Sequence, residues 1–241
     1  MLDLKNIYLE LGGTFITPID RIQDRLKHIK AFVFDWDGVF NDGRKDAGGS
    51  SNFSEVDSMG TNLLRYSYFL RKKQMPLTAI ISGEKNETAF YFSERECFNY
   101  SFYKISNKKL ALDKICEQEK IHPHEIAYFF DDVLDLPIAE VCGLRIMVNQ
   151  KSKPLFAEYC KDAHLMDYLT ACSGNRFAVR EACELLIALY GNYAEVMRSR
   201  TKYDEHYAQY ISHRREIKPN FYTLKDNAIE QANAGTIGFG K

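Results

Sequence analysis

Short, mostly apolar runs alternate with segments of helical spacing along most of this chain. Runs of four to six such residues suit strands that are covered on both faces, as in a parallel sheet between layers of helices. The pattern therefore predicts an α/β fold with a doubly wound parallel sheet. The predicted strands are 31–34, 77–81, 98–103, 126–130 and 144–148, with a last edge strand at 163–166.

The 241 residues divide into three stretches by the same pattern. We expect an N-terminal helical segment over 1–29, a core over 30–190, and a C-terminal helical extension with a flexible tail over 191–241. Helical spacing covers roughly 176–198 and 201–215, and the tail begins near Lys218. Within the core, the turn-rich stretch 41–52 contains Asp-Gly and Gly-Gly and predicts a small hairpin.

Composition and charge exclude several classes of protein. Hydrophobic residues make up 45% of the chain and the net charge is −1, so no global field attracts nucleic acid or anionic membrane. No apolar run approaches the ~20 residues of a membrane span, and the N-terminus lacks the pattern of a signal peptide. We expect a cytoplasmic protein. Six scattered cysteines without a CxxC pair predict neither a zinc site nor a disulfide framework.

Polar residues follow four of the predicted strands. In such sheets, ligands bind beyond the carboxyl ends of the strands. A single Asp at such a place is usually a helix cap, but the coincidence at four strand ends predicts a site. The groups are Asp35 and Asp37 after the first strand, Ser82-Gly83 after the second, Lys108 and Lys109 after the third, and Asp131, Asp132 and Asp135 after the fourth.

This set of residues favours phosphoryl chemistry. Closely packed carboxylates repel one another unless a cation neutralises them, and a set without His or Cys favours Mg²⁺. With Mg²⁺, a hydroxyl and a lysine, the natural ligand is a phosphoryl group. An Asp carboxylate can act as nucleophile to give an aspartyl-phosphate, and a second acid two residues later can serve as general acid and base.

The same residues resemble the four motifs of the haloacid dehalogenase (HAD) superfamily phosphatases. The motifs are Asp35–Val39 (DWDGV), Ser82-Gly83, Lys109, and Asp131–Asp135 (DDVLD). Response-regulator receivers share some of these residues, but there the acidic pair comes first along the chain, whereas here it comes last. The order favours a HAD protein.

The likeness is greatest to the small capless HAD phosphatases. These act on 3-deoxy-D-manno-octulosonate 8-phosphate, an intermediate of lipopolysaccharide biosynthesis, or on nine-carbon sialic-type sugar-acid phosphates. The stretches that carry the likeness are DWDGVFNDG from Asp35, DSMG from Asp57, AYFFDDVLDLP from Ala127 and GNRFAVRE from Gly174. The resemblance implies an Mg²⁺-dependent phosphomonoester hydrolase without a cap domain.

The resemblance also implies a role for each motif residue. Asp35 is the nucleophile and a Mg²⁺ ligand, and Asp37 is the general acid and base and a ligand through its carbonyl. Asp131 is the third protein ligand of the metal ion. Asp132 and Asp135 orient Asp131 or the metal-bound water. The implied phosphoryl-binding residues are Ser82 and Lys109, and the implied substrate-binding residues are Ser82, Gly83, Asp57 and Arg176.

Three positions depart from the family pattern. Val56 stands where an Arg is expected, Glu84 where a second Arg is expected, and Phe130 where a Gly is expected. These departures motivate an alternative: a HAD-fold protein whose altered pocket serves binding or assembly.

Two further expectations concern partners. Tyr203, Tyr207 and Tyr210 stand near several basic residues, a pattern that can bind single-stranded nucleic acid, but interspersed acids and helical spacing favour a packed face. We expect no nucleic acid and no membrane partner. A capless site open to solvent predicts a homo-oligomer, most simply a tetramer, with the hairpin of residues 42–55 and the helices beyond 189 at the interface.

Overall fold

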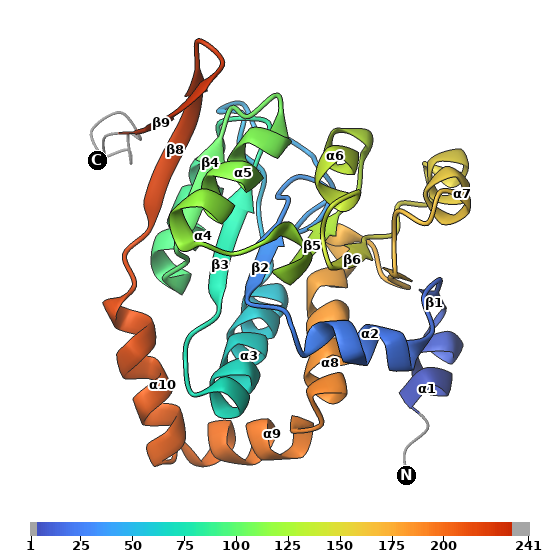
Figure 1. Ribbon diagram of the computed structural model, residues 1–241, viewed down its shortest axis with the longest axis vertical. Helices are drawn as coiled ribbons and strands as arrows, with labels where there is room; N and C mark the ends of the chain where they lie inside the picture. Colours follow the sequence, from blue (N-terminus) through green and yellow to red (C-terminus); the bar gives the residue numbers. More distant parts are fainter. Residues whose placement is uncertain (1–3, 233–241) are drawn as a thin grey trace.

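The computed structural model describes residues 4–232 (Figure 1). Within them nine strands form one sheet in the order β1-β7-β6-β5-β2-β3-β4-β8-β9. Neighbouring strands are parallel except for the two edge pairs, β1 with β7 and β8 with β9. The strands are β1 Thr14–Phe15, β2 Ala31–Phe34, β3 Leu77–Ile81, β4 Tyr100–Tyr103, β5 Ile126–Phe130, β6 Leu144–Met147, β7 Tyr168–Leu169, β8 Asn220–Lys225 and β9 Ala228–Gln231.

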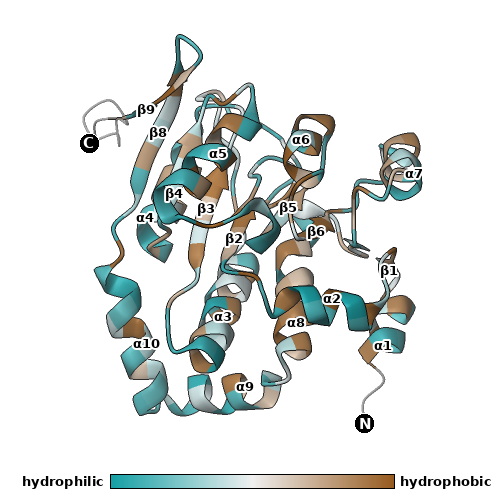
Figure 2. Cartoon of the chain, in the orientation of Figure 1, coloured by the Kyte–Doolittle hydropathy of each residue, from teal (hydrophilic) through white to brown (hydrophobic). Residues whose placement is uncertain are grey.

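Helices cover both faces of this sheet. The α-helices are α1 Leu4–Leu11, α2 Ile19–Leu26, α3 Glu55–Lys72, α4 Glu87–Glu96, α5 Lys108–Glu119, α6 Leu136–Ala139, α7 Pro154–Asp162, α8 Ala178–Tyr190, α9 Tyr193–Lys202 and α10 Glu205–Glu216. Successive side chains of a strand point to opposite faces. Phe32 and Phe34 of β2 accordingly join the core of α2, α3 and α8, whereas Ala31 and Val33 join that of α5 and α6. Figure 2 shows these central strands as largely hydrophobic. The predicted doubly wound α/β fold is confirmed, and the described residues contain no separate cap.

Helices α3 and α8 pack against each other on the face of the sheet to which Phe32 and Phe34 of β2 point. Ser54 caps α3 by accepting a hydrogen bond from the Val56 amide at 3.1 Å. The two helices approach closely at Gly60, where an added Cβ would lie 3.0 Å from the Cα of Arg180. Glycine is needed there because the backbone of α8 occupies the space of a side chain.

The predicted hairpin at 41–52 is wrong. Residues 42–54 are all described, and none of them is in a strand. The Asp46 carboxylate accepts hydrogen bonds from the amides of Gly48 at 2.8 Å and Ser50 at 2.9 Å, and Asp42 accepts one from Arg44 at 3.1 Å. These aspartates satisfy the local backbone in place of a strand ladder. We call residues 42–54 the acidic loop.

The N-terminal and C-terminal segments contain strands, whereas the sequence predicted only helices and a flexible tail there. β1 lies in the N-terminal segment, and β8 and β9 lie in the stretch expected to be a flexible tail. The predicted edge strand at 163–166 is a turn with His164 at φ 52°, and the strand is β7, two residues further on. The predicted helix at 176–198 is two helices, separated at Gly191 with φ 73°. The remainder of the tail, 233–241, lies outside the described residues.

Within residues 4–232, none of the helices combines the length and the apolar character that crossing a membrane requires.

Replacing Gly60 tests the close approach of α3 and α8. Gly60→Val should lower the free energy of unfolding by about 2 kcal/mol, because the new side chain meets the α8 backbone. Valine has a better helix propensity than glycine, so the loss cannot come from propensity. Met59→Val, at a partly exposed position of the same helix, should lower it by less than about 1 kcal/mol. Urea unfolding followed by circular dichroism measures both, and equal losses would contradict the packing argument.

Candidate active site

The parallel register brings the predicted site residues to one edge of the sheet. Phe34, the last residue of β2, pairs with Ile80 of β3 and Phe129 of β5, so the residues that follow these strands lie side by side. A cavity of about 770 Å³ opens at this edge. Its lining includes Asp35, Asp37, Gly83, Glu84, Lys108, Asp131, Asp132, Asp135 and Lys153.

A buried lysine joins two of the carboxylates. The Lys108 ammonium lies 2.6 Å from Oδ1 of Asp35 and 2.6 Å from Oδ1 of Asp135. The Tyr128 hydroxyl donates a second hydrogen bond to Asp135 at 2.5 Å. Burial alone would lower the pKa of Lys108, but the two carboxylates outweigh burial and raise it, so the ammonium stays charged. Burial, and then the charge of Asp135, raises the pKa of Asp35.

Three carboxylates at this place could hold a metal ion. One oxygen each from Asp35, Asp131 and Asp135 lies within 4.8 Å of the others. An all-oxygen, all-carboxylate set suits a hard cation such as Mg²⁺. The sequence predicted Asp35 and Asp131 as ligands, and the structure brings these two together. The structure also places Asp135 in this cluster, although the sequence predicted that Asp135 only orients a ligand or a metal-bound water.

A second lysine neutralises the other side of the cluster. Lys153 Nζ lies 2.8 Å from Oδ2 of Asp131 and 2.6 Å from Oδ2 of Asp132. Burial raises the pKa of Asp131 to about 6, and Lys153 opposes this shift. Burial also acts to raise the pKa of Asp132, but the hydrogen bond from Lys153 leaves it lowered. The sequence analysis did not predict Lys153, although it follows β6 and ligands bind beyond the carboxyl end of that strand as well.

Asp37 is held by the acidic loop. Its carboxylate accepts hydrogen bonds from the Ser51 hydroxyl at 2.5 Å and from Lys45 Nζ at 2.5 Å. Ser51 is itself fixed, because its oxygen accepts hydrogen bonds from Trp36 at 3.1 Å and Asn86 at 2.7 Å. The loop thus orients the second acid of the first motif.

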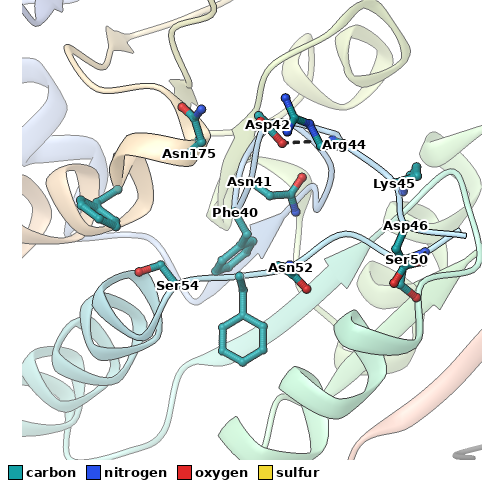
Figure 3. Close-up of a pocket in the computed structure, with 13 residues that line it drawn as sticks. Phe40, Asn41, Asp42, Arg44, Lys45, Asp46, Ser50, Asn52, Ser54 and Asn175 are labelled. Atoms are coloured by element: carbon teal, nitrogen blue, oxygen red, sulfur yellow. Dashed lines mark hydrogen bonds between the residues drawn. The ribbon is translucent and has the colours of Figure 1, made fainter. Parts of the chain in front are cut away.

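The acidic loop also borders a second hollow. Figure 3 shows the loop passing from Asp42 through Lys45 and Asp46 to Ser54, with Asn175 facing it from the start of the α8 segment. This hollow measures about 320 Å³, and Asp42 lines both it and the cavity at Asp35. The hollow and the cavity at Asp35 therefore adjoin at Asp42.

Lys108, and not Lys109, occupies the place predicted for the site lysine. Lys109 is partly exposed and pairs with Asp113 one turn along α5. Successive residues on a helix point about 100° apart, so only one of the two neighbouring lysines can face Asp35. The assignment of Lys109 to the site is corrected on this ground.

The structure separates the remaining predicted residues. Ser82 is buried at the end of β3 and its hydroxyl accepts a hydrogen bond from the Glu84 amide at 3.3 Å. Asp57 does not line the cavity at Asp35: it is fully buried between α3 and α8, where it accepts a hydrogen bond from the Arg180 amide at 2.8 Å. Its other oxygen has no partner among residues 4–232, and burial raises the pKa of Asp57 to about 7. Arg176 is exposed and lines a different hollow with Asn149 and Ser173.

Curated relatives match most of the chain, although no family model does. The 3-deoxy-D-manno-octulosonate 8-phosphate phosphatase KdsC of Escherichia coli BL21-DE3 is 30% identical over 183 residues, which cover 72% of this chain and 87% of the relative. The enzyme of the same name from Yersinia pestis is 26% identical over 70% of this chain and 84% of its own length.

Solved structures give the same picture. A probable YrbI family phosphatase from Pseudomonas syringae has a TM-score of 0.64 at 28% identity, over 76% of this chain and 98% of its own. A 3-deoxy-D-manno-octulosonate 8-phosphate phosphatase from Moraxella catarrhalis, solved with magnesium, phosphate and KDO, has a TM-score of 0.63 at 25% identity, over 76% of this chain and 99% of its own. A HAD superfamily subfamily III A hydrolase from Legionella pneumophila has a TM-score of 0.63 at 26% identity, over 76% of this chain and 96% of its own. By sequence identity, coverage and fold together, the chain belongs to the KdsC-like phosphatases of the HAD superfamily.

Proposed function

We propose that this protein is an Mg²⁺-dependent phosphomonoesterase that hydrolyses a phosphorylated sugar acid through an aspartyl-phosphate on Asp35. The observation that carries the proposal is the buried Lys108 ammonium, which holds the Asp35 carboxylate at the mouth of an acidic cavity. The names of the relatives support a substrate of the 3-deoxy-D-manno-octulosonate 8-phosphate class. Sialic-type 9-phosphates stay the second class, on the sequence motifs alone.

The proposed reaction has two steps. An oxygen of Asp35 attacks the phosphorus, the ester P–O bond breaks, and Asp37 gives a proton to the leaving sugar oxygen. Water then attacks the aspartyl-phosphate while Asp37 takes up a proton, which releases inorganic phosphate and restores Asp35. Ser51 and Lys45 orient Asp37 for both transfers. Lys108, which lines the cavity, is proposed to hold the phosphoryl oxygens. Ser82 is buried and does not line the cavity, so the same role for its hydroxyl stays a prediction from the sequence.

The residues fit a magnesium ion. Asp35 and Asp131 would hold it, with Asp135 next to them and the carbonyl of Asp37 as a further ligand. When bound, the ion neutralises charge on the phosphoryl oxygens.

The alternative function is a protein whose altered pocket serves binding or assembly. The three departures from the family pattern give it little support, because two of them lie outside the cavity. Phe130 is fully buried in the core of α5 and α6 and does not line the cavity. Val56 lies on the exposed side of α3, also outside the cavity. Only Glu84 stands in the cavity wall. Its negative charge favours a substrate with few anionic groups near the second motif.

Phosphate release from a panel of substrates tests the function. We expect turnover of 3-deoxy-D-manno-octulosonate 8-phosphate or a nine-carbon sugar-acid phosphate, and none with Asp35→Asn, which keeps the shape of the side chain but removes the nucleophile. Asp37→Asn should reduce kcat by about 10²–10⁴-fold. Turnover by Asp35→Asn at the native rate contradicts the covalent mechanism. Absence of activity on every phosphate ester, including p-nitrophenyl phosphate, favours the binding alternative.

The two neighbouring lysines of α5 make a matched pair of variants. Lys108→Met should lower kcat by about 10²–10³-fold, since it removes the charge that holds Asp35. Lys109→Met should change kcat by less than about twofold, because its partner is Asp113 on the surface of α5. Circular dichroism and melting curves establish that both variants fold. The reverse ranking of the two rates overturns the assignment of Lys108.

Magnesium affinity should depend on Lys153. Chelation with EDTA should abolish turnover reversibly, and Mg²⁺ should raise the melting temperature of the native chain. Lys153→Met should tighten Mg²⁺ binding by about threefold or more, because the ammonium competes with the metal ion for Asp131. Lys151→Met, an exposed lysine of the same loop, is the control and should leave the affinity unchanged. Isothermal titration with Mg²⁺ measures this effect without an activity assay, and weaker binding by Lys153→Met would contradict it.

The homo-oligomer predicted from the sequence, most simply a tetramer, stays a proposal. The acidic loop is not the hairpin expected to pair between subunits, so the interface must use other backbone groups. Light scattering on the full chain measures the state directly.

A further inference from the structure

A second hollow lies between the core and the C-terminal extension. The extension runs from the end of α8 through α9, below α3, and then along α10 to β8 (Figure 1). We call the hollow of about 400 Å³ between α3, the end of α4, and α9–α10 the extension groove. It shares none of its lining residues with the cavity at Asp35. The mechanism proposed above does not use it.

Arginines dominate the charge around the extension groove. Two of the lining arginines already have acidic partners. Arg214 pairs with the Glu96 carboxylate at 2.8 Å, and Arg95 pairs with Glu96 and with Glu55 in the first turn of α3. The carboxylates of Glu55 and Glu96 are therefore already shared among these arginines. Because the lining holds more arginines than carboxylates, the extension groove carries an excess of positive charge.

Two further arginines of the groove have no acidic partner. Within residues 4–232, neither Arg200 of α9 nor Arg215 of α10 forms an ion pair. The Nε of Arg200 is buried and has no hydrogen-bond partner in the same part of the chain. The Arg200 guanidinium lies over the rings of Tyr207 at 4.7 Å and Tyr203 at 5.4 Å, which fixes its position. The terminal NH₂ groups of a guanidinium fixed in this way match the oxygens of a phosphate, and the exposed Arg215 adds a second positive charge beside it.

The groove also has an apolar and aromatic wall. Tyr203, at the end of α9, is 57% exposed, and Met59 of α3 is 38% exposed. The neighbouring helix α10 is hydrophilic over most of its length (Figure 2). Tyr203 packs edge to face against Tyr207, with ring centroids 4.9 Å apart, so its ring is held in place. A flat ring on the ligand could stack on this wall.

We propose that the extension groove is a second binding site, for a small phosphate ester that carries a planar ring. Arg200 and Arg215 bind the phosphate, and Tyr203 contacts the ring. The ligand differs in chemistry from a sugar-acid phosphate, which has no planar ring. The site is independent of the proposed phosphatase activity, and its test is a measurement of binding.

Phenylphosphonate is the probe, because its P–C bond is not a phosphate ester and the proposed hydrolysis cannot consume it. Titration calorimetry on the full chain with Mg²⁺ should detect binding to the extension groove. Asp131→Asn removes a metal ligand, so binding that persists in this variant does not belong to the cavity at Asp35. Arg200→Met with Arg215→Met should weaken that binding by about tenfold or more. The Arg200→Met, Arg215→Met double variant should leave turnover of the substrate within about twofold, because neither residue lines the cavity at Asp35.

Arg198→Met is the matched control. Arg198 is an exposed arginine of α9 that does not line the extension groove, so its loss matches the charge change of the single variant Arg215→Met without touching the site. Methylphosphonate should bind more weakly than phenylphosphonate to the native chain, and Tyr203→Leu should remove the difference. Arg215→Met alone, at an exposed position, serves if the double variant does not fold.

Three results would overturn the proposal. The first is absence of phenylphosphonate binding by the Asp131→Asn chain. The second is unchanged binding in the Arg200 and Arg215 variants. The third is an equal loss in Arg198→Met, which would indicate attraction by net charge alone. Equal binding of both phosphonates would overturn the part assigned to the ring.

Discussion

A buried ion triad of Asp35, Lys108 and Asp135 is the constraint on which the site depends. Buried charges are tolerated only when they are paired and hydrogen-bonded. The triad takes Asp35 from the end of β2, Lys108 from the first turn of α5 and Asp135 from the segment after β5. Tyr128 of β5 completes it by donating to Asp135. Any change in the register of β2 and β5 or the rotation of α5 would leave a charge without its partner.

The remaining charges of the site can be understood from the same constraint. Five aspartates meet three lysines there: Asp35, Asp37, Asp131, Asp132 and Asp135 against Lys45, Lys108 and Lys153. Asp42 and Glu84 in the cavity wall add further negative charge. The expectation that the carboxylates need a cation is therefore met in part by lysines, and the remaining negative charge suits a divalent cation.

Much of the sheet and most of the acidic residues at its edge could be predicted from the sequence. Buried parallel strands are apolar on both faces, so β2, β3 and β5 stand out at their observed bounds. The choice between Lys108 and Lys109 could not be made from composition, because it depends on the rotation of α5 by a third of a turn. β8 was missed because only two of its residues, Phe221 and Tyr222, are buried, and the rest of Asn220–Lys225 is polar or partly exposed, so the segment lacks the apolar run of a buried strand. The acidic loop was missed because aspartate side chains took over the hydrogen bonds of the expected hairpin.

The pairing of β8 with β4 has a consequence for the order in which the molecule forms. Ser101 pairs with Phe221, so two neighbouring strands are separated by 120 positions along the chain. Closing so long a loop is slow relative to local contacts. The sheet from β7 to β4, with the triad at its edge, contains its partners well before residue 220 and can assemble during synthesis. The strands β8 and β9 are added only when the end of the chain has left the ribosome, so this edge of the sheet is the part that a shortened chain would lose.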